Sequence, residues 1–172
     1  MTEKWAKEYM EALEEKMDTY TEANLLEQDE ASKLWYLRTL FAVYQDQSAH
    51  VMVQAMVIEL KKDAPQVEII VNMMFEEENI CYDELEKAIG ELNYLSPAGA
   101  FGIRRKENRI YLRNCWVLDK DKTVEALVAD TVVLYEIMLE AARAAYTGLY
   151  KIAMGEITYE EAVEQDLLRR AE

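Results

Sequence analysis

The stretch that most restricts the fold is a candidate β-hairpin, Phe101 to Leu118, which reads FGIRRKENRIYLRNCWVL. Its polar centre, Lys106 to Asn108, has no residue of high strand propensity and predicts the turn. With a loop of two or four residues, Arg105 pairs with Ile110, and apolar and basic side chains separate onto opposite faces. A three-residue loop would mix them, because a slip of one residue turns every side chain over. The apolar face is predicted to hold Phe101, Ile103, Ile110, Leu112 and Trp116, and the basic face Arg104, Lys106, Arg109, Tyr111 and Arg113.

The composition predicts a single domain over residues 1–172. The chain is 51% hydrophobic and has a formal net charge of −15. A domain of this length buries about 70% of the surface that its unfolded chain exposes, so it needs no disulfide or metal to fold. The negative charge opposes general attraction to nucleic acid or anionic membrane, and it suits either simple solubility or a basic partner.

The cysteines and the terminal sequence indicate a cytoplasmic protein. Cys81 and Cys115 form no CxxC pair and are predicted to be reduced, buried thiols. The first ten residues contain no apolar segment of the signal-peptide kind. The most apolar stretch, Val124 to Met154, is interrupted by acids and an arginine, so no membrane span is expected.

The first half of the chain predicts a helix and then three strands. Trp5, Tyr9, Leu13, Met17 and Tyr20 recur at spacings of three and four and indicate an amphipathic helix. Thr19 to Ser32 is polar and is interpreted as a connection, with room for a helical turn at Leu25 and Leu26. Segments rich in strand formers follow at Leu34–Tyr44, His50–Leu60 and Val67–Phe75, and the first of them could also be a buried helix.

The second half predicts helices on both sides of the hairpin. Helical spacing covers Asp83–Leu95 and then Thr123–Ala153, which is either continuous or broken at Gly148. Thr158 to Glu161 has the form of a capping box and opens a last helix through Leu168. The predicted fold is a two-layer α+β sandwich with a five-stranded antiparallel sheet, in the order α-βββ-α-ββ-α plus a short C-terminal helix.

Alternating positions of the three strands differ in character. One set carries large and β-branched groups and predicts the core face. The other set is semi-apolar, and it could be covered by the chain's own helices, by a second copy or by a foreign partner. The predicted partner-binding residues on it are Tyr36, Met52, Met56, Ile58, Ile70 and Met74.

The basic hairpin face also leaves three interpretations open. Its cations can pair with the chain's own acids, bind an acidic protein, or bind nucleic acid or a phosphate ligand, because arginine can hold a carboxylate or phosphate with two hydrogen bonds. Screening acts over about 8 Å at physiological salt, so a negative protein can keep a locally positive patch.

Several local sequences match a known pattern, namely Leu92 to Leu95, Phe101 to Ile103, Asn108 to Arg113, Trp116 to Leu118 and Gly155 to Ala162. With the order of elements, this stretch resembles the YbjN-like proteins, which share the fold of the type III secretion chaperones. The resemblance covers little more than half the chain. It implies an acidic, dimer-forming protein that binds other proteins and performs no chemistry.

No catalytic pattern accompanies these features. The chain contains no GxGxxG, P-loop, GxSxG or HExxH sequence, and its single histidine, His50, lacks zinc-ligand spacing with the cysteines. We therefore expect no metal, no cofactor and no enzymatic activity. The sequence favours a chaperone-like or adaptor domain that binds protein segments as a homodimer, and the alternatives are a regulator that binds a small anion on the basic face or an uncharacterised enzyme.

Overall fold

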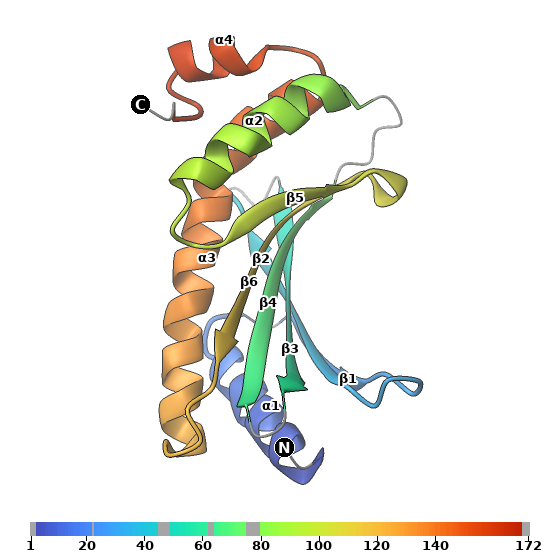
Figure 1. Ribbon diagram of the computed structural model, residues 1–172, viewed down its shortest axis with the longest axis vertical. Coiled ribbons are helices and arrows are strands. Elements are labelled where there is room, and N and C mark those ends of the chain that lie inside the picture. Colours follow the sequence, from blue (N-terminus) through green and yellow to red (C-terminus); the bar gives the residue numbers. More distant parts are fainter. Residues whose placement is uncertain (1–2, 22, 45–48, 62–63, 75–79, 170–172) are drawn as a thin grey trace. The chain divides into compact units, whose positions relative to one another are not determined.

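The computed structural model describes residues 3–21, 23–44, 49–61, 64–74 and 80–169. These residues form a six-stranded antiparallel sheet, in the order β1-β2-β3-β4-β6-β5, together with helices (Figure 1). The elements are α1 (Glu3–Met17), β1 (Asn24–Gln28), β2 (Trp35–Ala42), β3 (His50–Lys61), β4 (Ala64–Met74), α2 (Tyr82–Leu95), β5 (Ala100–Arg104), a 3-10 turn η1 (Arg105–Glu107), β6 (Arg109–Val117), α3 (Val124–Ala153) and α4 (Tyr159–Glu164).

The predicted α+β class is confirmed, but the prediction of five strands is wrong. The additional strand is β1, in the polar stretch that was interpreted as a connection. It pairs antiparallel with β2, from Asn24 opposite Thr39 to Gln28 opposite Trp35. The neighbouring segment that could have been a helix, Leu34–Tyr44, contains strand β2.

The polar residues after β1 form its turn. The Asp29 carboxylate accepts hydrogen bonds from the backbone N–H of Ser32 at 2.6 Å and from its hydroxyl at 2.7 Å. These bonds lower the pKa of Asp29. Lys33 takes the left-handed conformation with φ 59°, which completes the reversal. The acidic composition of this stretch is therefore turn chemistry between two paired strands.

By its contacts the chain divides into two compact units. Unit 1 comprises residues 1–70 and 114–136, and unit 2 comprises residues 71–113 and 137–172. Strands β4 and β6 and helix α3 contribute residues to both units. Whether the chain acts as one domain stays a prediction.

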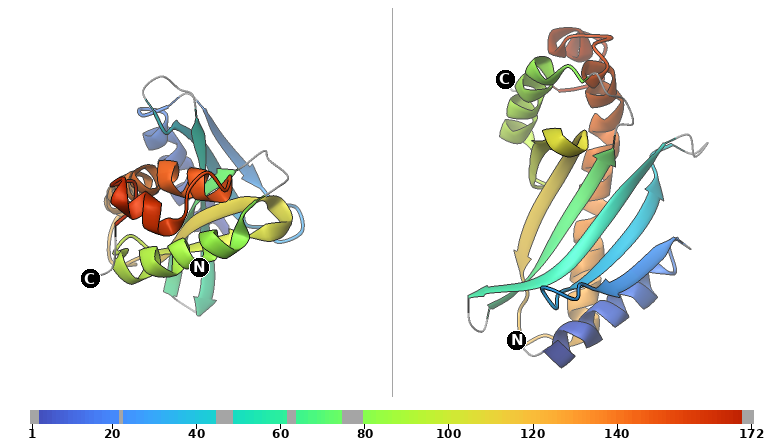
Figure 2. Two further views of the ribbon diagram at one scale, coloured as in Figure 1. Left: turned by 90° about the horizontal axis from the view of Figure 1, so that it is seen from above. Right: turned by 90° about the vertical axis from the view of Figure 1, so that its right-hand side faces the viewer.

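The core of unit 1 lies between α1, the first half of α3 and one face of the strands. Helix α1 contacts β1, β2 and β3 (Figure 2). Leu37, Val51 and Val53, which belong to the alternating set predicted for the core, are fully buried. The Tyr9 and Thr131 hydroxyls meet at 2.6 Å inside this layer, and burial raises the pKa of Tyr9 strongly. Fully or nearly fully buried side chains here include Leu13, Met17, Leu37, Val51, Val53, Val57, Val67, Ile69, Leu127 and Tyr135.

The hairpin of unit 2 has the predicted faces in a different register. Ile103 lies opposite Ile110 and Phe101 opposite Leu112, two residues away from the predicted pairing of Arg105 with Ile110. Of the two loop lengths left open by the sequence, two or four residues, the hairpin has four, at residues 105–108. The turn η1 fills this loop, and Asn108 takes a left-handed conformation with φ 46°. A shift of two residues keeps the side chains of the paired residues, 100–104 and 109–113, on their predicted faces.

Helix α3 is continuous over 30 residues, so Gly148 does not break it. The glycine serves a close approach instead. A Cβ atom at Gly148 would lie 2.6 Å from Cγ of Leu168 and 3.1 Å from the carbonyl oxygen of Leu167. The C-terminal segment therefore packs directly on the helix backbone at this point.

The last predicted helix is shorter than expected. The capping box between Thr158 and Glu161 is present and opens α4, but the helix ends at Glu164 and not at Leu168. Asp166 then takes the left-handed conformation with φ 57°. This turn directs Leu168 onto α3, where the leucine is 5% exposed.

Two predictions about burial near the end of β6 are wrong. Trp116 was expected in the core but is 57% exposed. It follows Arg113, the last residue of β6 that pairs with β5, so the hairpin faces no longer apply. Cys115 is also exposed, with its Sγ atom 3.0 Å from Oε1 of Gln66, whereas Cys81 is half-buried.

Candidate functional site

One face of the sheet in unit 1 is semi-apolar and partly exposed, and it also carries Glu27, Arg38 and Gln54. The facing pairs on it are Leu25 with Arg38, and Leu40 with Met52. Leu25 is 52% exposed and Leu40 is 42% exposed, whereas the neighbouring Thr39, which faces the helices, is fully buried. We call this surface the open face and define it by Leu25, Tyr36, Leu40, Met52 and Ile58.

The predicted partner-binding residues divide on this surface. Tyr36, Met52 and Ile58 are half-buried on the open face. Met56 is 9% exposed and Ile70 is 7% exposed, so these two side chains are buried and offer little accessible surface. The side chain of Met74 lies outside the described residues.

A shallow hollow of about 180 Å³ marks the exposed part of the open face. Leu25, Leu40 and Met52 line it together with Arg38. The Arg38 guanidinium lies 2.6 Å from the Glu27 carboxylate on β1, so this cation is neutralised within the sheet. The surface around the hollow is therefore apolar with a paired charge at its side.

The basic hairpin face belongs to unit 2 and is partly paired with the chain's own groups. The Arg104 guanidinium lies over the Tyr111 ring, 5.6 Å from its centroid. Glu107 accepts from Arg109 at 3.2 Å and lies 3.8 Å from Arg104. Arg109 also donates to the Asn72 side chain at 3.3 Å. These contacts correspond to the interpretation in which the cations pair within the chain.

The remaining cations of the predicted patch, Lys106 and Arg113, are exposed. Arg105, which was not predicted as a site residue, lies beside Lys106 in η1. It is paired with Glu86 of α2, which raises its pKa, and its guanidinium lies 4.8 Å from the Tyr82 ring centroid. The turn of the hairpin is thus held to α2 by an ion pair and a cation–π contact.

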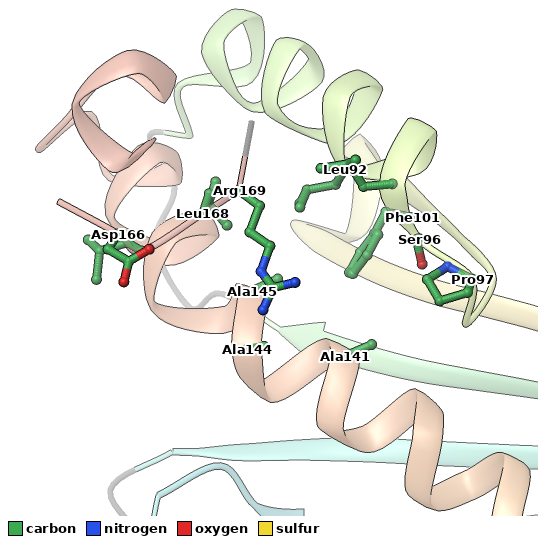
Figure 3. Close-up of a pocket in the computed structure, with 12 residues that line it drawn as sticks. Leu92, Ser96, Pro97, Phe101, Ala141, Ala144, Ala145, Asp166, Leu168 and Arg169 are labelled. Carbon is green, nitrogen blue, oxygen red and sulfur yellow. The ribbon is translucent and has the colours of Figure 1, made fainter. Parts of the chain in front are cut away.

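Unit 2 also contains a cavity that the sequence did not predict. It has a volume of about 580 Å³ and lies between the end of α2, the middle of α3 and the segment after α4 (Figure 3). Most of its lining residues are apolar, and the polar ones are Ser96, Asp166 and Arg169. The lining residues include Leu92, Phe101, Ala141, Ala144, Ala145 and Leu168.

The sequence did not reveal the full open face or the cavity. Leu25 was interpreted as part of a connection, and Leu40 was placed on the semi-apolar face without being chosen as a site residue. The cavity brings together residues from positions 92–101, 141–145 and 166–169. A pattern along the chain does not reveal an arrangement made by three distant segments.

No protein-family model, curated protein or solved structure matches the chain. The YbjN-like resemblance therefore stays a prediction. Within residues 3–169, apart from the gaps, no three His, Cys, Asp or Glu side chains lie close enough together to hold a metal ion. In the same residues, no helix combines the length and apolarity that crossing a membrane requires.

Proposed function

We propose that the protein is a non-enzymatic protein-interaction domain, of the chaperone-like or adaptor kind, and that the open face binds segments of other proteins. The observation that supports this proposal most directly is that Leu25 and Leu40 are exposed beside Met52, although all three lie in paired strands of the sheet. An antiparallel sheet with one solvated face normally carries polar groups there. Apolar groups that gather on such a face are typical of interaction surfaces.

The proposed partner is an apolar, extended segment that carries lysines or arginines. The chain has 34 acidic and 19 basic residues, so its field attracts basic segments and repels acidic ones. Met52 adds an unbranched, polarisable side chain that can adapt to different apolar groups. The apolar contacts would supply affinity, and the charge would select the partner and speed the encounter.

A second copy of the chain is the competing occupant of the same face, and a homodimer remains part of the prediction from sequence. Charge argues against it at low salt, because each copy carries a formal charge of −15. A stable dimer would also bury about 1,600 Å² in total, which takes about 20–30 residues on each side, whereas seven residues line the hollow near Leu40. Light scattering of the purified protein at micromolar concentration distinguishes the two occupants.

The binding test uses a model peptide in which apolar residues alternate with lysine, and a matched peptide with glutamate in place of lysine. We expect the lysine peptide to bind and the glutamate peptide not to bind, as measured by fluorescence anisotropy. Leu40→Glu should weaken binding about tenfold, because burying a carboxylate against an apolar side chain costs more than 1.4 kcal/mol.

The matched control is Val133→Glu, which changes another exposed apolar residue of unit 1 that lies on α3 and not on the open face. Both variants add the same charge, so general attraction to the lysine peptide changes equally. Equal affinities of the two variants, or binding of both peptides alike, would contradict the proposal. A dimer that dissociates only in Leu40→Glu would instead assign the open face to a second copy.

The anion-binding alternative on the hairpin has weaker support. Glu107 already lies between Arg104 and Arg109 and offers them the carboxylate that a ligand would supply. An added anion would have to compete with this local group. On the open face, Leu25 and Leu40 remain 52% and 42% exposed.

A further inference from the structure

We propose that the cavity of unit 2 is a binding site for a small anionic amphiphile, namely a carboxylate on a medium-length apolar chain. This site lies in another unit than the open face and does not depend on the function proposed for that face. The volume of about 580 Å³ lies within the range of about 300–1,000 Å³ that is typical of small-ligand sites.

The apolar walls define the chain of the ligand. Phe101 is 6% exposed and Leu168 is 5% exposed, so their side chains are fixed by packing while they line the cavity. Ala141, Ala144 and Ala145 of α3 leave room because their side chains are short. An unbranched hydrocarbon chain is the group that such a surface removes from water most favourably.

Arg169 defines the charge of the ligand. Figure 3 shows its side chain extending from the C-terminal segment across the cavity, with the guanidinium among the labelled residues. Among residues 3–169 that are described, no acidic group pairs with this guanidinium. Asp166 also lines the cavity, and Figure 3 shows its carboxylate apart from the guanidinium. Arg169 is exposed at the edge of the apolar walls, and its planar guanidinium can hold a carboxylate with two parallel hydrogen bonds.

Ser96 also lines the cavity, but its Oγ atom is covered by the protein and has no hydrogen-bond partner in the part of the chain that the structure describes. This hydroxyl therefore does not define the ligand. The cavity offers an apolar wall and the Arg169 guanidinium, which forms no ion pair with a described residue.

The test titrates the whole protein with decanoate by calorimetry at neutral pH, below the concentration at which decanoate forms micelles. Decanol is the neutral probe of equal chain length. We expect one decanoate to bind per chain, and we expect decanol to bind at least tenfold more weakly. Arg169→Gln should lower the affinity for decanoate about tenfold, because a charge-assisted pair is lost, and Ala144→Phe should abolish binding by filling the cavity from an exposed helix position.

Arg143→Gln is the matched control. Arg143 is a cation of α3, the helix that carries Ala144, but it lies outside the cavity lining and pairs with Glu140 at 2.9 Å. This variant should bind decanoate as the unaltered protein does. The proposal is overturned if decanoate shows no saturable binding, if decanol binds equally well, or if Arg169→Gln and Arg143→Gln behave alike. Circular dichroism of each variant establishes that it is folded, and Arg169→Gln alone decides the question if Ala144→Phe does not fold.

Discussion

Two helical glycines of unit 2 differ in the space around them, so replacing each by alanine tests how closely single residues are packed. A Cβ atom added to Gly90 in α2 would meet nothing within 4 Å. A Cβ atom added to Gly148 in α3 would lie within 3 Å of the Leu168 side chain. The same substitution, glycine to alanine, should therefore have opposite signs at the two positions.

Gly90→Ala should raise the free energy of unfolding by about 1 kcal/mol, because alanine favours the helix more than glycine does. Gly148→Ala gains the same preference but overpacks a buried contact, which typically costs about 1–3 kcal/mol. We expect a net decrease of the unfolding free energy at Gly148. Urea denaturation measures both changes, and a stabilised Gly148→Ala would show that the C-terminal segment does not pack closely on α3.

At the scale of an element, helix α4 depends on its capping box. It has six residues, too few to be stable as an isolated helix. The Thr158 hydroxyl accepts from the backbone N–H of Glu161 at 3.2 Å, and a Glu161 oxygen accepts from the backbone N–H of Thr158 at 2.7 Å. Thr158→Ala should lower the unfolding free energy by about 1 kcal/mol, whereas Thr158→Ser should retain most of it, as measured by denaturation.

The same capping box makes a pH prediction. Hydrogen bonds from Thr158 lower the pKa of Glu161 in the folded protein below its ordinary value of 4.5. A lowered pKa stabilises the folded protein above the ordinary value, and this stabilisation is lost as the pH falls through the folded value. The unfolding free energies of the protein and of Glu161→Gln should therefore differ most at neutral pH and converge below about pH 4. A constant difference between pH 7 and pH 3 would show that Glu161 does not form the box in solution.

The elements that were predicted follow from patterns within one segment, whereas the strand that was missed depends on contacts with distant segments. The hairpin faces and the long helix follow from side-chain periodicity within one segment, so Phe101 and Leu112 were placed on the correct side. Strand β1 depends on partners elsewhere. Its Leu26 N–H donates to the Glu14 side chain of α1 at 3.2 Å, and Gln28 donates to Glu3 at 3.0 Å. The sequence pattern within residues 19–32 does not predict these hydrogen bonds.

The candidate sites follow the same division. Tyr36, Met52 and Ile58 could be placed on a semi-apolar face, because alternation fixes which side of a strand a residue faces. Alternation does not reveal how far neighbours cover each side chain, so Met56 and Ile70 were selected although they are buried. Arg169 and Ser96 are separated by 73 positions in the sequence, and only the folded chain shows that both line one cavity.

For the whole molecule, the net charge of −15 predicts how stability depends on salt. Long-range repulsion between acids lowers stability, and local ion pairs raise it. Raising the salt from about 10 mM to about 150 mM shortens the screening length from about 30 Å to about 8 Å. Repulsion between the many acids then falls, and exposed pairs such as Arg38–Glu27 also weaken. Such pairs contribute about 1 kcal/mol or less each, so we expect repulsion to dominate and the melting temperature to rise by a few degrees. A melting temperature that falls with sodium chloride would show that the ion pairs contribute more than the repulsion does.

The hydrogen bond between Tyr9 and Thr131 joins residues that lie 122 positions apart. During synthesis the ribosome releases the N-terminal residues first, at about 5–20 residues per second. Helix α1 and strands β1–β3 therefore emerge several seconds before the first half of α3 that completes their core. Unit 1 cannot reach its final packing until residue 136 has left the exit tunnel, and the segment 71–113, which belongs to unit 2, is produced during that interval. The nascent chain must consequently hold a half-covered apolar sheet in the cell while the ribosome is still translating.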